Sequence, residues 1–383
     1  MCGLYIHVPF CGSRCIYCDF YSTTEGKALR SQYVSVLCEE IKSRGAENGF
    51  PSLRTIYIGG GTPSLLSTRD ELTEIIKTVR EHFDAGGVSE FTIEANPDDV
   101  TPGWVQDCLE LGINRVSLGV QSFDDSLLSF LSRRHTAQQA CDAVDLLHES
   151  GLHNISIDLI FGLPGQTPDG WRQDLKQALA LPVKHLSAYA LMYEPGTALY
   201  AMREKGFVHE ADEETSLSMF EALEDATRAA GFEHYEISNF ARPGYRSQHN
   251  SSYWNGTPYI GVGPGAHSFD GTSRRRNLAD LRAYVTSAGK VPYETELLTK
   301  HDCYDEYVMT RLRTSDGLST DEISRRFGPD FGDYFRQAAA PHLQARRLEE
   351  TEDGRLRLSR AALFVSDDVM SDLMWPDEAP CRA

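Results

Sequence analysis

The sequence lacks a long apolar run. No stretch approaches the length of a membrane span, and the first residues, Met1 to Leu4, form neither a basic leader nor a small-residue cleavage site. We therefore expect a cytoplasmic protein. With 383 residues, 41% of them hydrophobic, the chain is long enough to bury a large core and to build two domains.

Basic residues are also few compared with acidic residues. Lys and Arg total 37 against 56 Asp and Glu, so the net charge is -19, and no long run of one sign occurs. A field of this sign opposes non-specific contact with phosphate groups. We therefore expect no nucleic-acid partner.

The sequence also lacks the pattern of cysteines that indicates disulfide pairing. Of nine cysteines, six stand alone in a long chain without an export signal, so reduced thiols are their expected state. The other three, Cys11, Cys15 and Cys18, share one short loop directly after the first apolar run.

Apolar, β-branched runs alternate with longer amphipathic stretches, the order that predicts a parallel α/β sheet. Polar or glycine-rich segments follow most of the predicted strands, and in a βα barrel that edge is the active-site mouth. We therefore predict a partial, TIM-like barrel of six βα units. Its strands are expected at Leu4 to Val8, Thr55 to Ile58, Glu90 to Ile93, Arg115 to Val120, Asn154 to Ile160 and His185 to Leu191.

The βα rhythm ends after Met192, where a helix at Ser216 to Ala230 and a strand at Tyr235 to Phe240 are expected. Further on, three helical patterns and an Asp353-Gly354 hairpin predict a small α+β, winged-helix-like domain. The predicted division is a barrel at 1–240, an extension or lid at 241–298, a C-terminal domain at 299–375 and a tail at 376–383.

The spacing Cys11-x-x-x-Cys15-x-x-Cys18 favours a 4Fe-4S cluster, because three thiolates on so short a loop reach adjacent irons of one cubane. Three ligands leave one iron open to a further molecule. The alternative is a structural zinc site with His7 or a distant residue as fourth ligand. Three side chains of the same loop are expected to shield the cluster from water: Ile16, Tyr17 and Phe20.

Polar residues at other strand ends suit a bound ligand. Gly59 to Thr62 lets the backbone approach a ligand closely, with a plain tight turn as the alternative. Glu94 and Asp158 are placed to pair with an ammonium group or with hydroxyls, or else to cap helices. Gln121 and Arg133 offer directional hydrogen bonds, although the arginine also fits a solvated helix end.

The cysteine loop after the first strand, with Gly59-Gly60-Gly61-Thr62-Pro63 after the second, resembles the radical S-adenosylmethionine superfamily. In that superfamily the open iron chelates the methionine amino and carboxylate groups, and reductive cleavage of the sulfonium yields a 5′-deoxyadenosyl radical. The resemblance implies a 4Fe-4S cluster on the three cysteines. The family's cofactor contacts then fall on Tyr5, Gly60, Gly61, Thr62, Glu94, Gln121, Arg133 and Asp158.

Longer segments are similar to the HemN-like, oxygen-independent coproporphyrinogen III dehydrogenases and their relatives. These segments are residues 5–11, 118–123 and 157–164 and the C-terminal unit. Two departures argue against the dehydrogenase's oxidative decarboxylation. Phe20 stands where the dehydrogenase has a fourth cysteine, and only ten residues precede Cys11, in place of an extension that helps to cover the substrate.

The segment His249-Asn250-Ser251-Ser252-Tyr253-Trp254 resembles the HNxxYW signature of the HemW-type haem chaperones. It offers the His249 imidazole as an axial iron ligand, with Tyr253 and Trp254 against the porphyrin. A structural role is the alternative, because buried His, Tyr and Trp commonly pack and hydrogen-bond.

This second resemblance implies a haem chaperone that delivers haem to haem-accepting apoproteins such as membrane-bound respiratory enzymes, and that uses an electron donor. Transient contact with the membrane fits this role, although no lipid-binding segment is visible. The residues leave open whether S-adenosylmethionine is cleaved. A dehydrogenase and a zinc-binding module remain the alternatives.

Overall fold

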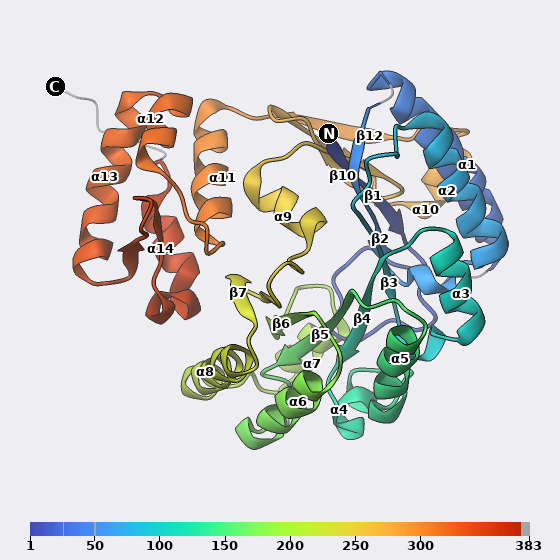
Figure 1. The fold of residues 1–383 in the computed structure, drawn as a ribbon, viewed down its shortest axis with the longest axis horizontal. Helices are drawn as coiled ribbons and strands as arrows, with labels where there is room; N and C mark the ends of the chain where they lie inside the picture. The colour runs from blue at the N-terminus through green and yellow to red at the C-terminus, as the bar shows by residue number, and fades with distance from the viewer. Residues whose placement is uncertain (26, 50, 377–383) are drawn as a thin grey trace.

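The computed structural model of the protein describes residues 1–25, 27–49 and 51–376, and six parallel strands form the centre of the molecule. The strands pair in sequence order, and they curve into an arc without closing (Figure 1). This confirms the predicted partial barrel of six βα units. The strands are β1 (Cys2–Val8), β2 (Leu53–Gly60), β3 (Glu90–Ala95), β4 (Arg115–Gln121), β5 (Ile155–Phe161) and β6 (His185–Ala190).

Helices cover the convex face of this arc (Figure 1). Several begin at a threonine whose hydroxyl accepts a backbone N–H of the first turn, as Thr101, Thr136 and Thr167 do. The helices of this part are α1 (Lys27–Glu47), α2 (Thr73–His82), α3 (Pro102–Glu110), α4 (Asp125–Phe130), α5 (Ala137–Glu149), α6 (Pro168–Ala180), α7 (Ala198–Glu204) and α8 (Glu213–Ala229). Single turns of 3-10 or π-helix lie at Pro63–Leu65, Thr68–Leu72 and Pro97–Asp99.

The two faces of the strands differ in chemistry. Successive side chains alternate between faces, so Leu4, Ile6 and Val8 of β1 point outward and are buried in the core under the helices. The inward positions are polar on most strands, for example Ser117 of β4 and Asp158 of β5. A (β/α)₈ barrel fills this space with branched apolar side chains. The interior of this arc is instead suited to hold a polar ligand.

Both edges of the arc are extended. Beside β1, β9 (Tyr259–Val262) pairs in parallel, followed by antiparallel β10 (His267–Phe269), β11 (Ser273–Asn277) and β12 (Tyr293–Leu297), with α10 (Leu281–Thr286) between the last two. Residues 259–297 thus lengthen the sheet. At the other edge, β8 (Asn239–Ala241) pairs antiparallel with β6 and with β7 (Glu233–Glu236). The single strand expected at Tyr235 to Phe240 is therefore wrong, because the chain reverses between β7 and β8.

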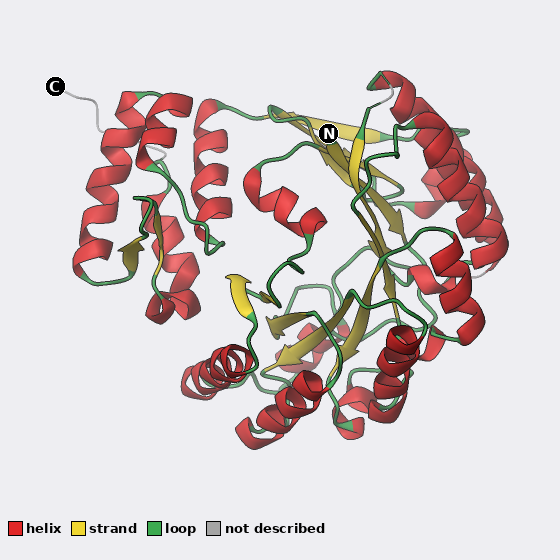
Figure 2. Cartoon of the chain, viewed as in Figure 1, coloured by secondary structure: helices red, strands yellow, loops and turns green. Residues whose placement is uncertain are grey.

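The C-terminal unit has its own hydrophobic core and lies beside the open side of the arc (Figure 2). It contains the three expected helices and the expected hairpin, and it ends in one more helix. The elements are α11 (Lys300–Leu312), α12 (Thr320–Phe327), α13 (Pro329–Gln344), β13 (Leu348–Glu350), β14 (Leu356–Leu358) and α14 (Ser366–Leu373), with a 3-10 helix at Arg360–Val365.

Between the arc and this unit lies α9 (Gln248–Asn255), on the concave side of the strands (Figure 1). Within the described residues, no helix combines the length and apolarity needed to cross a membrane. Most of the predicted tail, residues 377–383, lies outside the described residues. The proposed domain boundaries at 240 and 298 stay predictions.

Candidate functional site

A cavity of about 500 Å³ lies at the carboxyl edge of the six strands, the edge that the sequence predicts to be an active-site mouth. Ten of the fourteen predicted site residues line it, although they come from six separate segments of the chain. The ten are Cys11, Cys15, Cys18, Gly60, Gly61, Thr62, Glu94, Gln121, Arg133 and Asp158.

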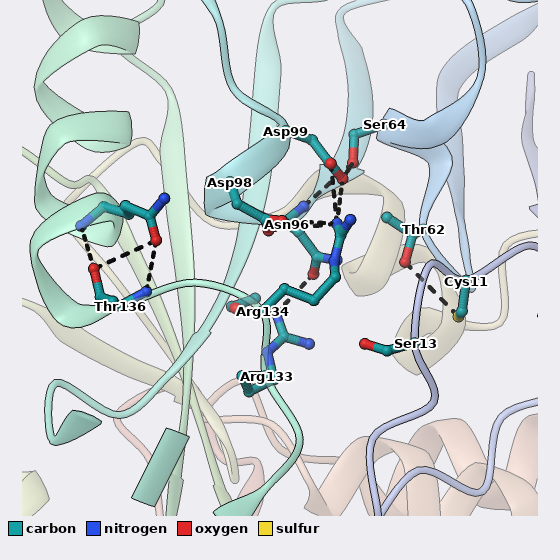
Figure 3. Close-up of polar contacts among 12 residues, drawn as sticks. Cys11, Ser13, Thr62, Ser64, Asn96, Asp98, Asp99, Arg133, Arg134 and Thr136 are labelled. Carbon is teal, nitrogen blue, oxygen red and sulfur yellow. Dashed lines mark hydrogen bonds and ion pairs between the residues drawn. The ribbon is translucent and has the colours of Figure 1, made fainter. Parts of the chain in front are cut away.

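The three cysteines lie on the loop after β1, and each is a partly buried free thiol. The Thr62 hydroxyl donates to the Cys11 sulfur at 3.7 Å, and Arg133 Nη1 donates to the Cys15 sulfur at 3.4 Å. Figure 3 shows Thr62 against Cys11, with Arg133 and Arg134 on the other side of the site. Donors are thus aimed at two of the three sulfurs, as they are at the sulfur ligands of iron-sulfur clusters.

His7 is not available as a fourth ligand beside these thiols. Its Nδ1 lies 3.0 Å from the Tyr5 hydroxyl and its Nε2 lies 2.9 Å from the Tyr21 carbonyl oxygen, and the side chain is buried. Among the described residues, no three His, Cys, Asp or Glu side chains converge on a point where one metal ion would sit. His7 therefore does not serve the zinc alternative as a fourth ligand. The form of that alternative with a distant fourth ligand stays open.

Arg133 connects the cysteine loop to the ends of two strands. Its Nη2 donates to Asn96 Oδ1 at 2.7 Å and to the Gly119 carbonyl oxygen at 2.5 Å. Its Nε is buried and has no hydrogen-bond partner in the described part of the chain. The neighbouring Arg134 pairs with Asp98 and Asp99 (Figure 3). The alternative of a solvated helix end therefore does not hold for Arg133.

The glycine segment after β2 requires residues without a side chain. Gly60 has φ +113°, and a Cβ there would lie 2.6 Å from the His7 ring. A Cβ on Gly61 would lie 2.6 Å from the Phe10 carbonyl oxygen. The segment thus packs against the base of the cysteine loop while it lines the cavity, which brings exposed backbone close to any ligand of the three thiols.

Two carboxylates face the cavity from β3 and β5. Glu94 accepts hydrogen bonds from the Tyr57 hydroxyl at 2.7 Å and from the Gly60 N–H at 3.1 Å. Burial, offset in part by the Tyr57 hydrogen bond, raises the pKa of Glu94 to about 7. Burial also raises the pKa of Asp158, against hydrogen bonds that favour its charge. Neither carboxylate caps a helix, and both gain from a cationic ligand.

Gln121, at the end of β4, has φ +69°, and the register with β5 is irregular at this point. A positive φ costs free energy in a residue with a side chain, and such outliers cluster at ligand sites. The strained backbone turns Gln121 into the cavity. No local signal in the sequence predicts this conformation.

Several lining residues were missed from the sequence. Most occupy inward positions of strands whose ends were recognised, so the two-residue period could have found them. They include Tyr57, Asn96, Arg115, Ser117, Ser187, Tyr189 and Asn250. Arg115 is buried, and its Nε and Nη1 have no hydrogen-bond partner among the described residues. In contrast, Tyr5, a predicted cofactor contact, points its hydroxyl at His7 and does not line the cavity.

His249 lies at the opposite, amino-terminal edge of the strands. Its Nδ1 is 2.8 Å from the Thr55 hydroxyl and its Nε2 is 2.9 Å from the Tyr253 hydroxyl, so both ring nitrogens are engaged. The side chain is buried, and this desolvation lowers the pKa of His249 to about 3. Its role as a haem ligand stays a prediction, and in this conformation neither nitrogen is free to bind iron.

Helix α9, which carries His249, is fixed at its start by Glu90. The buried carboxylate accepts hydrogen bonds from the N–H groups of Gln248 and His249 at 2.8 and 2.9 Å, and from the Ser247 hydroxyl at 3.3 Å. At the other end of the helix, the Trp254 ring lies 5.0 Å from the Arg313 guanidinium of the C-terminal unit. The HNxxYW segment thus connects the base of the barrel to the C-terminal unit.

These residues fit the groups that the motifs imply. The cavity offers three thiols, a glycine cradle that a Cβ would fill and buried guanidinium nitrogens without partners. It also offers carboxylates suited to an ammonium group. Such a donor set matches an iron-sulfur cluster with an amino-acid cofactor beside it.

Comparison with known proteins agrees with this chemistry. The family model of the Radical SAM superfamily matches residues 5–178, and that of the HemN C-terminal domain matches residues 298–365. The fold is also that of coproporphyrinogen III oxidase (HemN) from Escherichia coli, described as a radical SAM enzyme. The TM-score is 0.83 at 22% sequence identity, and the match covers 97% of this chain and 89% of that one. Fold and site together define a radical SAM protein.

Curated relatives show to which family within the radical SAM proteins the chain belongs. The chain is 36% identical to the heme chaperone HemW of Bacillus subtilis, over 96% of this chain and 98% of the relative. It is 35% identical to that of Lactococcus lactis, over 97% of each, and 39% identical to that of Escherichia coli, over 69% of each. The chain belongs to the HemW family. Membership of the radical SAM superfamily implies a 4Fe-4S cluster and S-adenosylmethionine.

Proposed function

We propose that this protein is a haem chaperone that holds a 4Fe-4S cluster on Cys11, Cys15 and Cys18, with S-adenosylmethionine beside it. The observation that supports this best is the convergence of three thiols, a glycine cradle and two buried carboxylates on one cavity. Haem would be carried to haem-accepting apoproteins such as respiratory enzymes. Where the acceptor lies in a membrane, contact with that membrane would be transient.

The chain's own residues prepare the site for a cationic amino-acid cofactor. Thr62 and Arg133 donate hydrogen bonds to two of the sulfurs. Glu94 and Asp158 provide negative charge for the ammonium and the hydroxyls, and Gln121 and Arg133 provide donors for the carboxylate and the ribose. What the cluster and cofactor supply when bound is one-electron chemistry, for which an electron donor is required.

The apolar side chains of the cysteine loop differ in their packing. Ile16 and Tyr17 pack on a small apolar cluster that contains Leu131 and Leu163. Phe20 is 64% exposed and lines the cavity. The shielding of an iron-sulfur cluster by these three side chains stays a prediction.

The test is anaerobic reconstitution with iron and sulfide, followed by haem titration in the Soret region and a coproporphyrinogen turnover assay on the same sample. A brown protein that binds haem without turnover is the expected result. A colourless protein that retains zinc would contradict the cluster. Turnover without stable haem binding would contradict the chaperone and indicate a dehydrogenase.

A further inference from the structure

Three apolar side chains with exposed surface form a patch along the lining of the cavity. Phe20 is 64% exposed and Met192 is 66% exposed, and both line the cavity together with the half-exposed Tyr189. Single exposed apolar side chains are ordinary, but several that converge at the entrance of a polar cavity mark a ligand surface. The site described so far leaves these three side chains without a role.

The patch is built from two loops that are fixed against each other. Phe20 belongs to the loop after β1, and Met192 belongs to the loop after β6. The Leu199 N–H, in the first turn of helix α7 directly after the second loop, donates to the Ile16 carbonyl oxygen of the first loop at 2.9 Å. Leu191 packs on the same apolar cluster as Ile16. Phe20 and Met192 are therefore held by ordered backbone on a shared rim.

The rim of the cavity carries both positive and negative side chains. Arg14 is exposed, lines the same cavity and has no hydrogen bond or ion pair with another residue of the described chain. Asp19 and Glu194 also line the mouth. A ligand with its own carboxylates would be drawn toward Arg14 and kept away from the two acidic side chains. The rim therefore suits a ligand that combines a flat apolar surface with carboxylates on one side.

We propose, on the basis of the proposed function, that haem binds at this rim, with its macrocycle on Phe20, a carboxylate at Arg14 and the Met192 thioether as an iron ligand. Thioether sulfur is a haem ligand in cytochromes, and an aromatic ring stacks on a flat macrocycle. Haem at this rim would leave the hydrogen bonds of His249 intact. Binding to His249 would require α9 to leave Thr55, Tyr253 and Glu90.

The experiment is a haem titration of the anaerobically reconstituted full chain, followed in the Soret region. Phe20→Ala is expected to weaken haem binding about tenfold. Met192→Leu keeps the apolar volume but removes the sulfur, so the Soret maximum is expected to shift as well. Phe207→Ala is the matched control, since Phe207 is 73% exposed but does not line the cavity, and it is expected to bind haem like wild type.

A second arm separates the two candidate ligands. His249→Gln, checked for folding by circular dichroism, is expected to leave the Soret maximum unchanged. The inference is overturned if Phe20→Ala and Met192→Leu bind haem like wild type. It is also overturned if Phe20→Ala impairs only haem transfer to an apoprotein, because the rim is then a protein-docking surface. If wild type itself binds no haem, the proposed function fails instead.

Discussion

Polar side chains occupy both ends of the barrel interior, but their partners differ. At the amino-terminal base, Glu90 accepts a hydrogen bond from the His249 N–H, and the Thr55 hydroxyl is hydrogen-bonded to the His249 ring. His185 is hydrogen-bonded to Ser156 and to Tyr235, at 2.7 Å each. At the mouth, the thiols, Glu94 and Arg133 line a cavity. Polar groups that satisfy each other hold the fold together, whereas polar groups left facing a cavity bind ligands.

The HNxxYW segment contributes residues to both of these regions. Its histidine belongs to the base network, while the next residue, Asn250, lines the cavity. Helix α9 therefore contacts both regions. Arg115 is an exception within the base, because it lines the cavity from below and lacks partners for two of its nitrogens.

The largest expected effect is at the mouth. Cys15→Ser removes a thiolate that the cluster needs, so we expect reconstituted protein to lose its brown colour and most of its bound iron. Iron and sulfide analysis after anaerobic reconstitution measures this. Cys141→Ser, a change on α5 away from the cavity, should retain the iron of wild type, and equal iron in the two variants would show that the loop holds no cluster.

The second-largest expected effect is at the amino-terminal base of the barrel. Glu90→Ala leaves the first N–H groups of α9 without their acceptor, so the free energy of unfolding should fall by about 3 kcal/mol. Denaturant unfolding measures it, with exposed Glu149→Ala as the control, expected within about 0.5 kcal/mol of wild type. Iron content should not change. A stable Glu90→Ala variant that binds no iron would contradict the division between base and mouth.

A smaller effect concerns pH at the mouth. Because burial raises the pKa of Glu94 to about 7, its carboxylate is lost as the pH falls through 7. Affinity for S-adenosylmethionine should then fall by up to about tenfold per pH unit below 7, and Glu94→Gln should flatten this dependence. Calorimetric titration between pH 6 and about pH 8 would measure it.

The stability of the ligand-free protein should also depend on the ionisation of Glu94. Stability should fall as the pH rises, whereas the affinity for S-adenosylmethionine should rise. Below the pKa of about 7 the folded state holds a proton on Glu94 that the unfolded chain, with a pKa near 4.5, has released. Stability from this group is therefore lost as the pH rises from 4.5 to 7. An affinity that does not change with pH in wild type would contradict both expectations.

The smallest effect lies where α9 meets the C-terminal unit. Trp254→Leu removes the ring under Arg313 and should lower the free energy of unfolding by about 1 kcal/mol. Cofactor affinity should stay at the wild-type value, because Trp254 does not line the cavity. A clear loss of S-adenosylmethionine binding would show that α9 carries a signal between the two regions.

Local patterns predicted the mouth well. Strand periodicity, the cysteine spacing and the glycine run are each contained in a few consecutive residues, and they placed nine of the ten lining residues on one edge, whereas Arg133 was named through the family resemblance. The base depends on contacts between distant segments, such as Thr55 with His249 and Gly3 beside Tyr259, which no local pattern shows. For the same reason the sequence left a buried, structural His249 as only one of two alternatives, and it did not indicate that Phe20 is exposed.

The central claim is that the mouth binds a cluster with an open iron and S-adenosylmethionine beside it. The most direct measurement is the electron paramagnetic resonance spectrum of the reconstituted, reduced protein with and without S-adenosylmethionine. We predict the spectrum of a reduced 4Fe-4S cluster that changes on addition of the cofactor in wild type, with no cluster signal in Cys15→Ser. A cluster signal that S-adenosylmethionine leaves unchanged, or no cluster signal in wild type, would contradict the account.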